Sequence, residues 1–209
     1  MRLATVTLTL TTVTLHAADL DATALLARLT RPPPDTTAFV EVRYSALLDR
    51  PIAVSGQLEH LEDGALVRRV EVPYRETMEL RGENVLVDRA GSKPRSFSLD
   101  RAPELRGMLS SFGSLLKGDR KSLERYFVMT VLGSDARWRI ELIPRDEKLK
   151  RRLDTIVVDG SLDRPRCFTL NEPDGDASVM ALGVQGPTEL PQPLERASLA
   201  AWCSGDTGH

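Results

Sequence analysis

The chain has 209 residues and a mass of 23.1 kDa, with 28 Lys and Arg against 30 Asp and Glu, so its net charge is −2. This length fits one domain or two small ones, and 41% hydrophobic with 28% charged residues excludes a mostly disordered chain. A near-neutral charge and 5% aromatic residues argue against a nucleic-acid-binding surface, while 2 Cys and 3 His leave little for a zinc or redox centre. We therefore expect no nucleic-acid partner, no metal and no cofactor.

The first 18 residues have the layout of a secretory signal peptide. Arg2 precedes an uncharged stretch over residues 3–15, and the small residues Ala17 and Ala18 follow it. This stretch is too short to span a bilayer as a helix. The alternative is a first β-strand, because leucines and valines alternate with threonines in it. The sequence favours a signal peptide at residues 1–18 and therefore export.

A helix is predicted over residues 21–29, where Leu25, Leu26 and Leu29 share one helical face and Asp19 or Asp21 can cap the first turn. Alternating runs separated by turn residues then predict about eleven strands. These lie at residues 38–47, 52–61, 66–72, 75–81, 84–89, 94–99, 127–132, 137–143, 153–158, 166–170 and 178–182. Successive hairpins predict an antiparallel meander.

Two helical segments interrupt the strands. Apolar residues at helical spacing predict a helix over residues 102–116, and Asp119 can cap a second helix that ends near Tyr126. Residues 144–152 form a further short, charged helical stretch. The fold class is thus mainly β with α: a curled, incomplete antiparallel barrel with a helical lid over its concave face. Such a half-barrel can hold an apolar ligand; the alternative is one dry core.

The C-terminal segment, residues 184–209, is rich in proline, and we expect it to be irregular. Cys203 lies in this tail and Cys167 in the body, and no other cysteine is present. In an oxidising compartment the two can form a disulfide that ties the tail to the body. The alternative is two separate thiols.

No motif for catalysis is recognisable, so no catalytic residue is predicted and the chain is not expected to be an enzyme. It lacks G-x-S-x-G, a Gly-rich phosphate loop, H-E-x-x-H and C-x-x-C. His60 could act as a general base, but a structural role at a strand end is favoured because no partner is in view. Asp174-Gly175-Asp176 resembles the start of a calcium loop, yet the other ligands are missing, so a hairpin turn is favoured.

Several short motifs follow one another along the chain: Phe39-x-Glu41, Leu47-Leu48-x-x-Pro51, Gly56-x-Leu58, Leu66-Val67-x-x-Val70-x-x-Pro73, Leu80-x-Gly82-x-x-Val85, Pro103-Glu104-Leu105, Leu115-Leu116-x-Gly118-Asp119-x-x-x-Leu123 and Trp138-x-Ile140-x-Leu142-x-Pro144. Over residues 21–182 this order resembles the LolA-like family, the periplasmic outer-membrane lipoprotein carriers of Gram-negative bacteria and their relatives. The resemblance implies that residues 19–183 form an incomplete barrel that holds acyl chains under a helical lid. It also implies lipoprotein or lipid cargo, an inner-membrane release complex and an outer-membrane acceptor. We expect the protein to be monomeric.

One departure from this family concerns the lid. The lipoprotein carriers place an arginine before a proline at the end of the second strand, where it helps to hold the lid closed. Glu62-Asp63-Gly64 stands at that place here, and the aromatic residues that line the carriers' cavity are fewer. The sequence therefore resembles a divergent branch that handles another lipid, such as a glycolipid, a polyene or a fatty-acyl product.

The candidate ligand-binding residues follow from this interpretation. The inner face of the lid would be formed by Leu105, Met108, Leu109 and Phe112, and the wall by Phe39, Leu58, Val70, Val72, Leu80 and Ile140. For each of them ordinary core is the alternative. Glu41 and Arg43 share a strand face with Phe39 and lie either in the cavity or outside it. Two other functions stay open: a lipid-sensing or scaffold protein of the envelope, and an acyl hydrolase.

Overall fold

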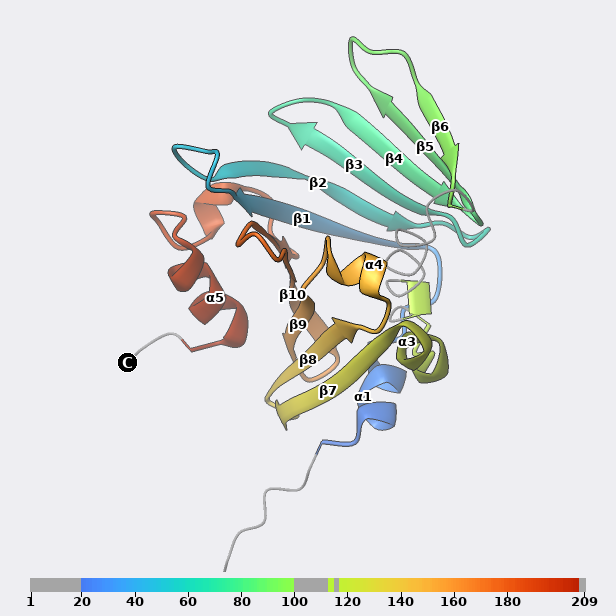
Figure 1. Ribbon diagram of the computed structural model, residues 1–209, viewed down its shortest axis with the longest axis vertical. Coiled ribbons are helices and arrows are strands. Elements are labelled where there is room, and N and C mark those ends of the chain that lie inside the picture. The colour runs from blue at the N-terminus through green and yellow to red at the C-terminus, as the bar shows by residue number, and fades with distance from the viewer. Residues whose placement is uncertain (1–19, 100–112, 115–116, 207–209) are drawn as a thin grey trace, which may run out of the picture.

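The computed structural model describes residues 20–99, 113–114 and 117–206, and within these ranges the chain forms one open antiparallel sheet (Figure 1). Its strands are β1 (Asp35–Tyr44), β2 (Ile52–His60), β3 (Leu66–Val72), β4 (Glu76–Arg81), β5 (Asn84–Arg89), β6 (Arg95–Ser98), β7 (Phe127–Ser134), β8 (Arg137–Pro144), β9 (Thr155–Ser161), β10 (Arg164–Asn171) and β11 (Ala177–Leu182). Their spatial order is β6-β5-β4-β3-β2-β1-β11-β10-β9-β8-β7. The eleven predicted strands and the open, curled sheet are confirmed.

The sheet consists of two meanders joined at its centre. From β1 to β6, and again from β7 to β11, each strand pairs with its neighbour in sequence. The two meanders meet where β1 pairs with β11, with Phe39 opposite Leu182. Strand β1 begins and ends three residues earlier than predicted, because residues after Tyr44 turn away. The amide of Leu48 donates to the carbonyl of Ser45 at 3.1 Å, and the amide of Ala46 to the Asp176 carboxylate at 3.2 Å.

The helices are α1 (Ala22–Leu29), α3 (Arg120–Tyr126), α4 (Glu147–Lys150) and α5 (Arg196–Ser204), with a 3₁₀ turn η2 (Pro187–Glu189). Asp21 caps α1 by accepting from the amide of Thr23, and Asp119 caps α3 by accepting from the amide of Ser122. Both caps match the expected N-terminal aspartates, which satisfy amides that have no partner within the helix. The predicted lid helix lies almost wholly outside the described residues, as does the predicted signal peptide.

The C-terminal segment is not irregular as expected from its prolines. Pro187 begins η2, and Pro191 and Pro193 lie before α5, so no proline interrupts residues 196–204. Leu199 and Cys203 are buried one helical turn apart. Cys203 forms a disulfide with Cys167 of β10, with a Cα–Cα distance of 5.6 Å. The prolines therefore lie in the connection that leads to α5, and not in the helix itself.

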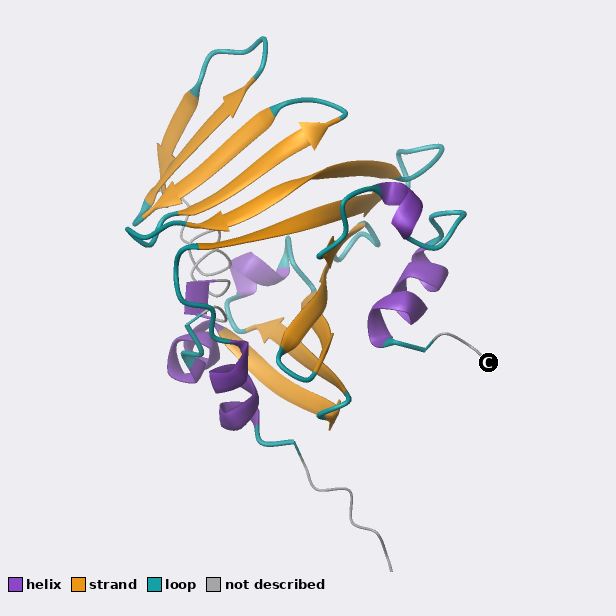
Figure 2. Cartoon of the chain, turned by 180° about the vertical axis from the view of Figure 1, so that it is seen from behind, coloured by secondary structure: helices purple, strands orange, loops and turns teal. Residues whose placement is uncertain are grey.

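The curl gives the sheet an inner and an outer face. We call inner the face that carries Phe39 and Ile140, and outer the face that carries Val40 and Val179. α5 and η2 lie on the outer side near the centre of the sheet, whereas α1, α3 and α4 lie on the other side, near β7 and β8 (Figure 2). The candidate site is therefore sought on the inner face.

Candidate functional site

The β7–β10 half of the inner face is filled with hydrophobic core. Helix α1 contributes Leu25 and Leu26, both fully buried, and α3 contributes Leu123. They pack with residues of β7, β8 and β9 and with the segment around α4, namely Phe127, Trp138, Ile140, Leu142, Leu149, Leu153, Ile156 and Val158. In this half, side chains of α1 and α3 cover the sheet where a ligand would otherwise lie.

Trp138 shows how tightly this half is packed. Its ring lies over Gly160, where an added Cβ would come within 2.2 Å of the indole. The indole N–H donates to the carbonyl of Leu162 at 3.0 Å, so the buried ring leaves no unpaired donor. This part of the inner face is a core and not a wall of a cavity.

The β1–β5 half of the inner face differs. The buried hydrophobic cluster there comprises Phe39, Val54 and Val70, and it is surrounded by partly buried residues, Leu58, Tyr74, Met180 and Leu182. Val85 of β5, which is 1% exposed, is buried outside this cluster. We call the cluster and its four partly buried neighbours the apolar wall. None of the helices in the described ranges contributes a side chain to it. An apolar surface that is buried only in part can bury more when a ligand covers it.

The predicted wall residues divide between these two halves. Phe39, Val70 and Leu58 lie in the apolar wall, and half-buried Leu80 extends it onto β4, opposite Leu66. Ile140 instead belongs to the core that α1 and α3 cover.

Val72 does not lie with Val70. The register of β2 and β3 shifts at Ser55/Gly56, which brings Val72 opposite Ser55. The side chain of Val72 is 56% exposed as a result. The lid residues Leu105, Met108, Leu109 and Phe112 lie outside the described residues.

A network of charged side chains borders the apolar wall. Glu41 is only 6% exposed, although it is ionisable. Its carboxylate accepts hydrogen bonds from Arg43 Nε at 2.7 Å, from Ser178 Oγ at 2.8 Å and from Arg68 Nη2. Arg68 also lies 3.7 Å from the carboxylate of Glu76. Glu41 and Arg43 therefore lie on the inner face, and they pair there.

These contacts keep Glu41 charged despite its burial. Burial alone would raise the pKa of Glu41, but the hydrogen bond from Arg43 and the positive charges of Arg68 and Arg43 outweigh it, so the pKa lies below its ordinary value. The pKa of Arg43 is raised, chiefly by its hydrogen bond to Glu41. The network is thus an ionised cluster next to an apolar surface.

Arg68 and Ser178 were not predicted from the sequence to belong to this face. A signal was available for Arg68, because it stands between Leu66 and Val70 at the same alternation and so points to the side of the wall. A charged residue at such a position requires a partner. No comparable signal existed for Ser178, since it reaches Glu41 only through the pairing of β1 with β11.

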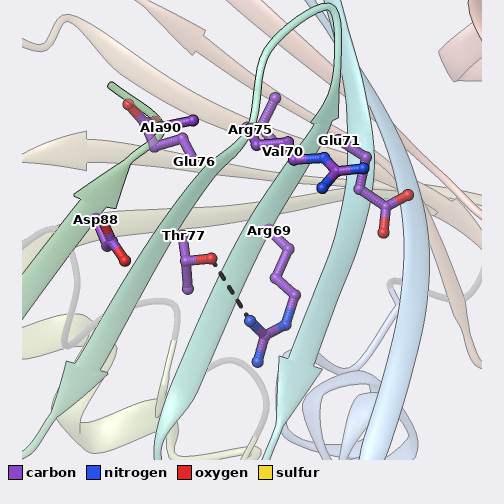
Figure 3. Close-up of a pocket in the computed structure, with 8 residues that line it drawn as sticks. All are labelled: Arg69, Val70, Glu71, Arg75, Glu76, Thr77, Asp88 and Ala90. Atoms are coloured by element: carbon purple, nitrogen blue, oxygen red, sulfur yellow. Dashed lines mark hydrogen bonds between the residues drawn. The ribbon is translucent and has the colours of Figure 1, made fainter. Parts of the chain in front are cut away.

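Two hollows lie mainly on the outer face of the sheet. One of about 510 Å³ lies at β3, β4 and β5, lined mostly by polar and charged residues: Arg69, Val70, Glu71, Arg75, Glu76, Thr77, Asp88 and Ala90 (Figure 3). The other, of about 480 Å³, lies between α5 and the β7–β8 hairpin, where Arg139 donates to the buried Asp159 carboxylate at 2.8 Å. Neither offers the continuous apolar lining that an acyl chain requires.

His60 shows no catalytic constellation in the described residues. Its ring is buried, and Nδ1 has no hydrogen-bond partner in the part of the chain that the structure describes. The same part contains no group of three or more His, Cys, Asp or Glu residues that could hold a metal, and none of its helices is long and apolar enough to cross a bilayer. The acyl hydrolase alternative therefore gains no support from His60.

An open, curled sheet with an apolar patch on its concave side defines a half-barrel class of fold. Residues 14–188 match the family model described as outer membrane lipoprotein carrier protein LolA-like, and the chain belongs to this family. The resemblance stated from the motifs is thereby confirmed. Members of this family are carrier or binding proteins by that description. No curated protein matches the chain.

The solved structures that the chain resembles come from several bacteria. A LolA superfamily protein from Nitrosomonas europaea is 12% identical, with a TM-score of 0.40, over 82% of this chain and 96% of that one. The MucA/MucB complex of Pseudomonas aeruginosa contains a chain that is 14% identical, with a TM-score of 0.41, over 80% of this chain and 57% of that one. LprF from Mycobacterium bovis is 14% identical, with a TM-score of 0.36, over 85% and 97%. The family assignment rests on the sequence match alone.

Proposed function

We propose that this protein is a periplasmic carrier that binds the acyl chains of a lipoprotein or another lipid on the apolar wall and shuttles them towards the outer membrane. The observation that carries the proposal is the difference between the two halves of the inner face. One half is filled by α1 and α3, whereas the other presents partly buried Leu58, Met180 and Leu182 without a covering helix in the described ranges.

The energetics suit a carrier. Each methylene that moves from water onto such a surface contributes about 0.8 kcal/mol, so a few methylenes hold a chain and still let it leave. Methionine at positions 78 and 180 provides a surface that adapts to different chains. In this proposal Leu105, Met108, Leu109 and Phe112 close over the chain, residues 1–18 direct export, and the monomer meets an inner-membrane release complex and an outer-membrane acceptor.

The first test is native mass spectrometry with lipid extraction on protein purified from its own periplasm. The expected result is a co-purifying acyl lipid or lipoprotein, which would also identify the cargo class. A mass that corresponds to the bare chain, unchanged by added lipid, would overturn the proposal. A stable complex with an inner-membrane protein and no release of lipid would instead favour the sensor or scaffold alternative.

A matched pair of variants locates the binding surface. Leu58→Ser changes the apolar wall, and Leu86→Ser changes an exposed leucine on the outer face of β5. We expect Leu58→Ser to weaken binding of a fluorescent acyl probe at least about tenfold, because it places a polar group against the chain. Leu86→Ser should leave binding unchanged. Equal binding by both variants would place the acyl chain elsewhere.

A further inference from the structure

We infer that Arg43 and Arg68 form a head-group site for an anionic amphiphile, an acyl chain that carries a phosphate or carboxylate. The inference rests on the proposed carrier function and specifies the class of cargo. Arg68 lies directly beside the apolar wall, with its guanidinium carbon 5.0 Å from the centre of the Phe39 ring. A ligand whose chain lies on the partly buried residues around Phe39 therefore brings its head group close to Arg68.

Arg43 has the donors that such a head group needs. Its Nε donates to Glu41, while Nη1 and Nη2 make no hydrogen bond to any residue in the described ranges. The side chain is 49% exposed, so these donors are accessible. Two parallel N–H groups of a guanidinium match two oxygens of a phosphate or carboxylate.

The charges of this region also favour an anion. Arg89 lies opposite Glu76 in the β4–β5 register, and its guanidinium carbon is 4.3 Å from the centre of the Tyr74 ring, itself part of the apolar wall. Three arginines, at positions 43, 68 and 89, thus face two glutamates, Glu41 and Glu76. One positive charge is left over beside an apolar surface, where a charge is screened less than in water.

Glu41 prepares the site without blocking it. Its hydrogen bonds orient Arg43 and Arg68 before a ligand arrives. When Arg43 turns towards an anion, Glu41 keeps its bonds from Arg68 and from Ser178, so no buried carboxylate is left without a partner. The cluster can therefore accept and release an anion without disturbing the sheet.

The test compares three probes at concentrations below micelle formation: hexadecyl phosphate, uncharged hexadecanol and inorganic phosphate. Each is titrated into the full-length mature protein and into Arg43→Gln and Arg137→Gln. Arg137 is an exposed outer-face arginine that pairs with Asp206, and it serves as the matched control. Circular dichroism confirms that each variant is folded. A double variant, Glu41→Gln with Arg68→Gln, removes a buried pair together and tests Arg68 without leaving Glu41 charged and unpaired.

The expected result is that the unmodified protein and Arg137→Gln bind hexadecyl phosphate at least about tenfold more tightly than hexadecanol. Arg43→Gln should reduce this preference below about threefold and leave hexadecanol binding unchanged. Equal binding of hexadecyl phosphate and hexadecanol by the unmodified protein would overturn the head-group site while the carrier proposal stands. Binding of neither would overturn both. Inorganic phosphate bound as tightly as hexadecyl phosphate would show an anion site unrelated to lipid, and an unchanged preference in Arg43→Gln would place the anion elsewhere.

Discussion

The two halves of the inner face contrast in what covers them. On the β7–β10 side, α1 and α3 place Leu25, Leu26 and Leu123 against the sheet. The buried core there has twelve residues, and partly buried residues such as Met129 and Phe168 lie at its border. On the β1–β5 side, a smaller cluster of three buried residues is surrounded by partly buried neighbours, with an ionised cluster at their border. One continuous sheet thus serves as scaffold at one end and as candidate binding surface at the other.

This difference separates stability from binding. A residue in the filled half contributes its burial to folding in every state of the protein, whereas a partly buried wall residue keeps some apolar surface that a ligand can still cover. Substitutions should therefore act on folding in one half and on affinity in the other. Substitutions in the two halves test that separation, from the largest expected effect to the smallest.

The largest effect is expected in the filled half. Phe127→Ala removes a fully buried ring and should lower the free energy of unfolding by about 3–5 kcal/mol. Chemical denaturation measures it. The neighbouring Val128, which is 44% exposed, provides the control, and Val128→Ala should change stability by less than about 1 kcal/mol. A Phe127→Ala loss as small as that of the control would mean that this half is not a packed core.

An intermediate and pH-dependent effect is expected at the ionised cluster. Glu41→Gln keeps the shape but removes the charge, and should cost about 2 kcal/mol at pH 7 because two charged hydrogen bonds weaken. The pKa of Glu41 is lowered in the folded state from its ordinary value of 4.5. Its ionisation therefore stabilises the fold above that value, and this stabilisation is lost as the pH falls through the folded pKa.

Denaturation of both proteins between pH 7 and pH 3 checks this sign. The advantage of the unmodified protein over Glu41→Gln should stay constant down to about pH 5 and then shrink. An advantage that grows as the pH falls would contradict an ionised Glu41.

The smallest effect on stability is expected in the β1–β5 half of the inner face. The effect on ligand binding there should nevertheless be clear. Leu80→Ala at a half-buried position of β4 should cost about 1 kcal/mol of stability, less than a fully buried leucine. Acyl-probe affinity should fall about fivefold or more, since Leu80 extends the wall. Fluorescence titration measures the affinity. If Leu80→Ala loses stability like Phe127→Ala and binds the probe normally, the two halves do not differ in role.

Much of the architecture was predictable because its signals are local. Alternation and turn residues placed all eleven strands, and Asp21 and Asp119 marked the helix starts as capping residues do. Helix α5 was missed because prolines before it dominated the composition. Val72 was misplaced because a register shift, which alternation cannot reveal, changes its environment.

The candidate site was predictable only in part, because it depends on contacts between distant segments. Phe39, Leu58 and Val70 were identified from apolar alternation. The assignment of Ile140 to a covered core required knowledge of where α1 lies. The partners of Glu41 come from β3 and β11, and no local pattern joins these strands to β1.

The pairing of β1 with β11 has a consequence for how the chain folds. All other strand pairs join neighbours in sequence and can form as successive hairpins while the chain is still incomplete. The β1–β11 pair cannot form until the last strand is present. Closure of the long loop between these two strands is therefore expected to limit the folding rate. Until then β1 is paired only with β2, so Phe39 and Val40, both fully buried in the finished sheet, remain on an edge strand. A chain that folds after threading through a membrane would therefore pass its most aggregation-sensitive moment just before its C-terminal strand arrives.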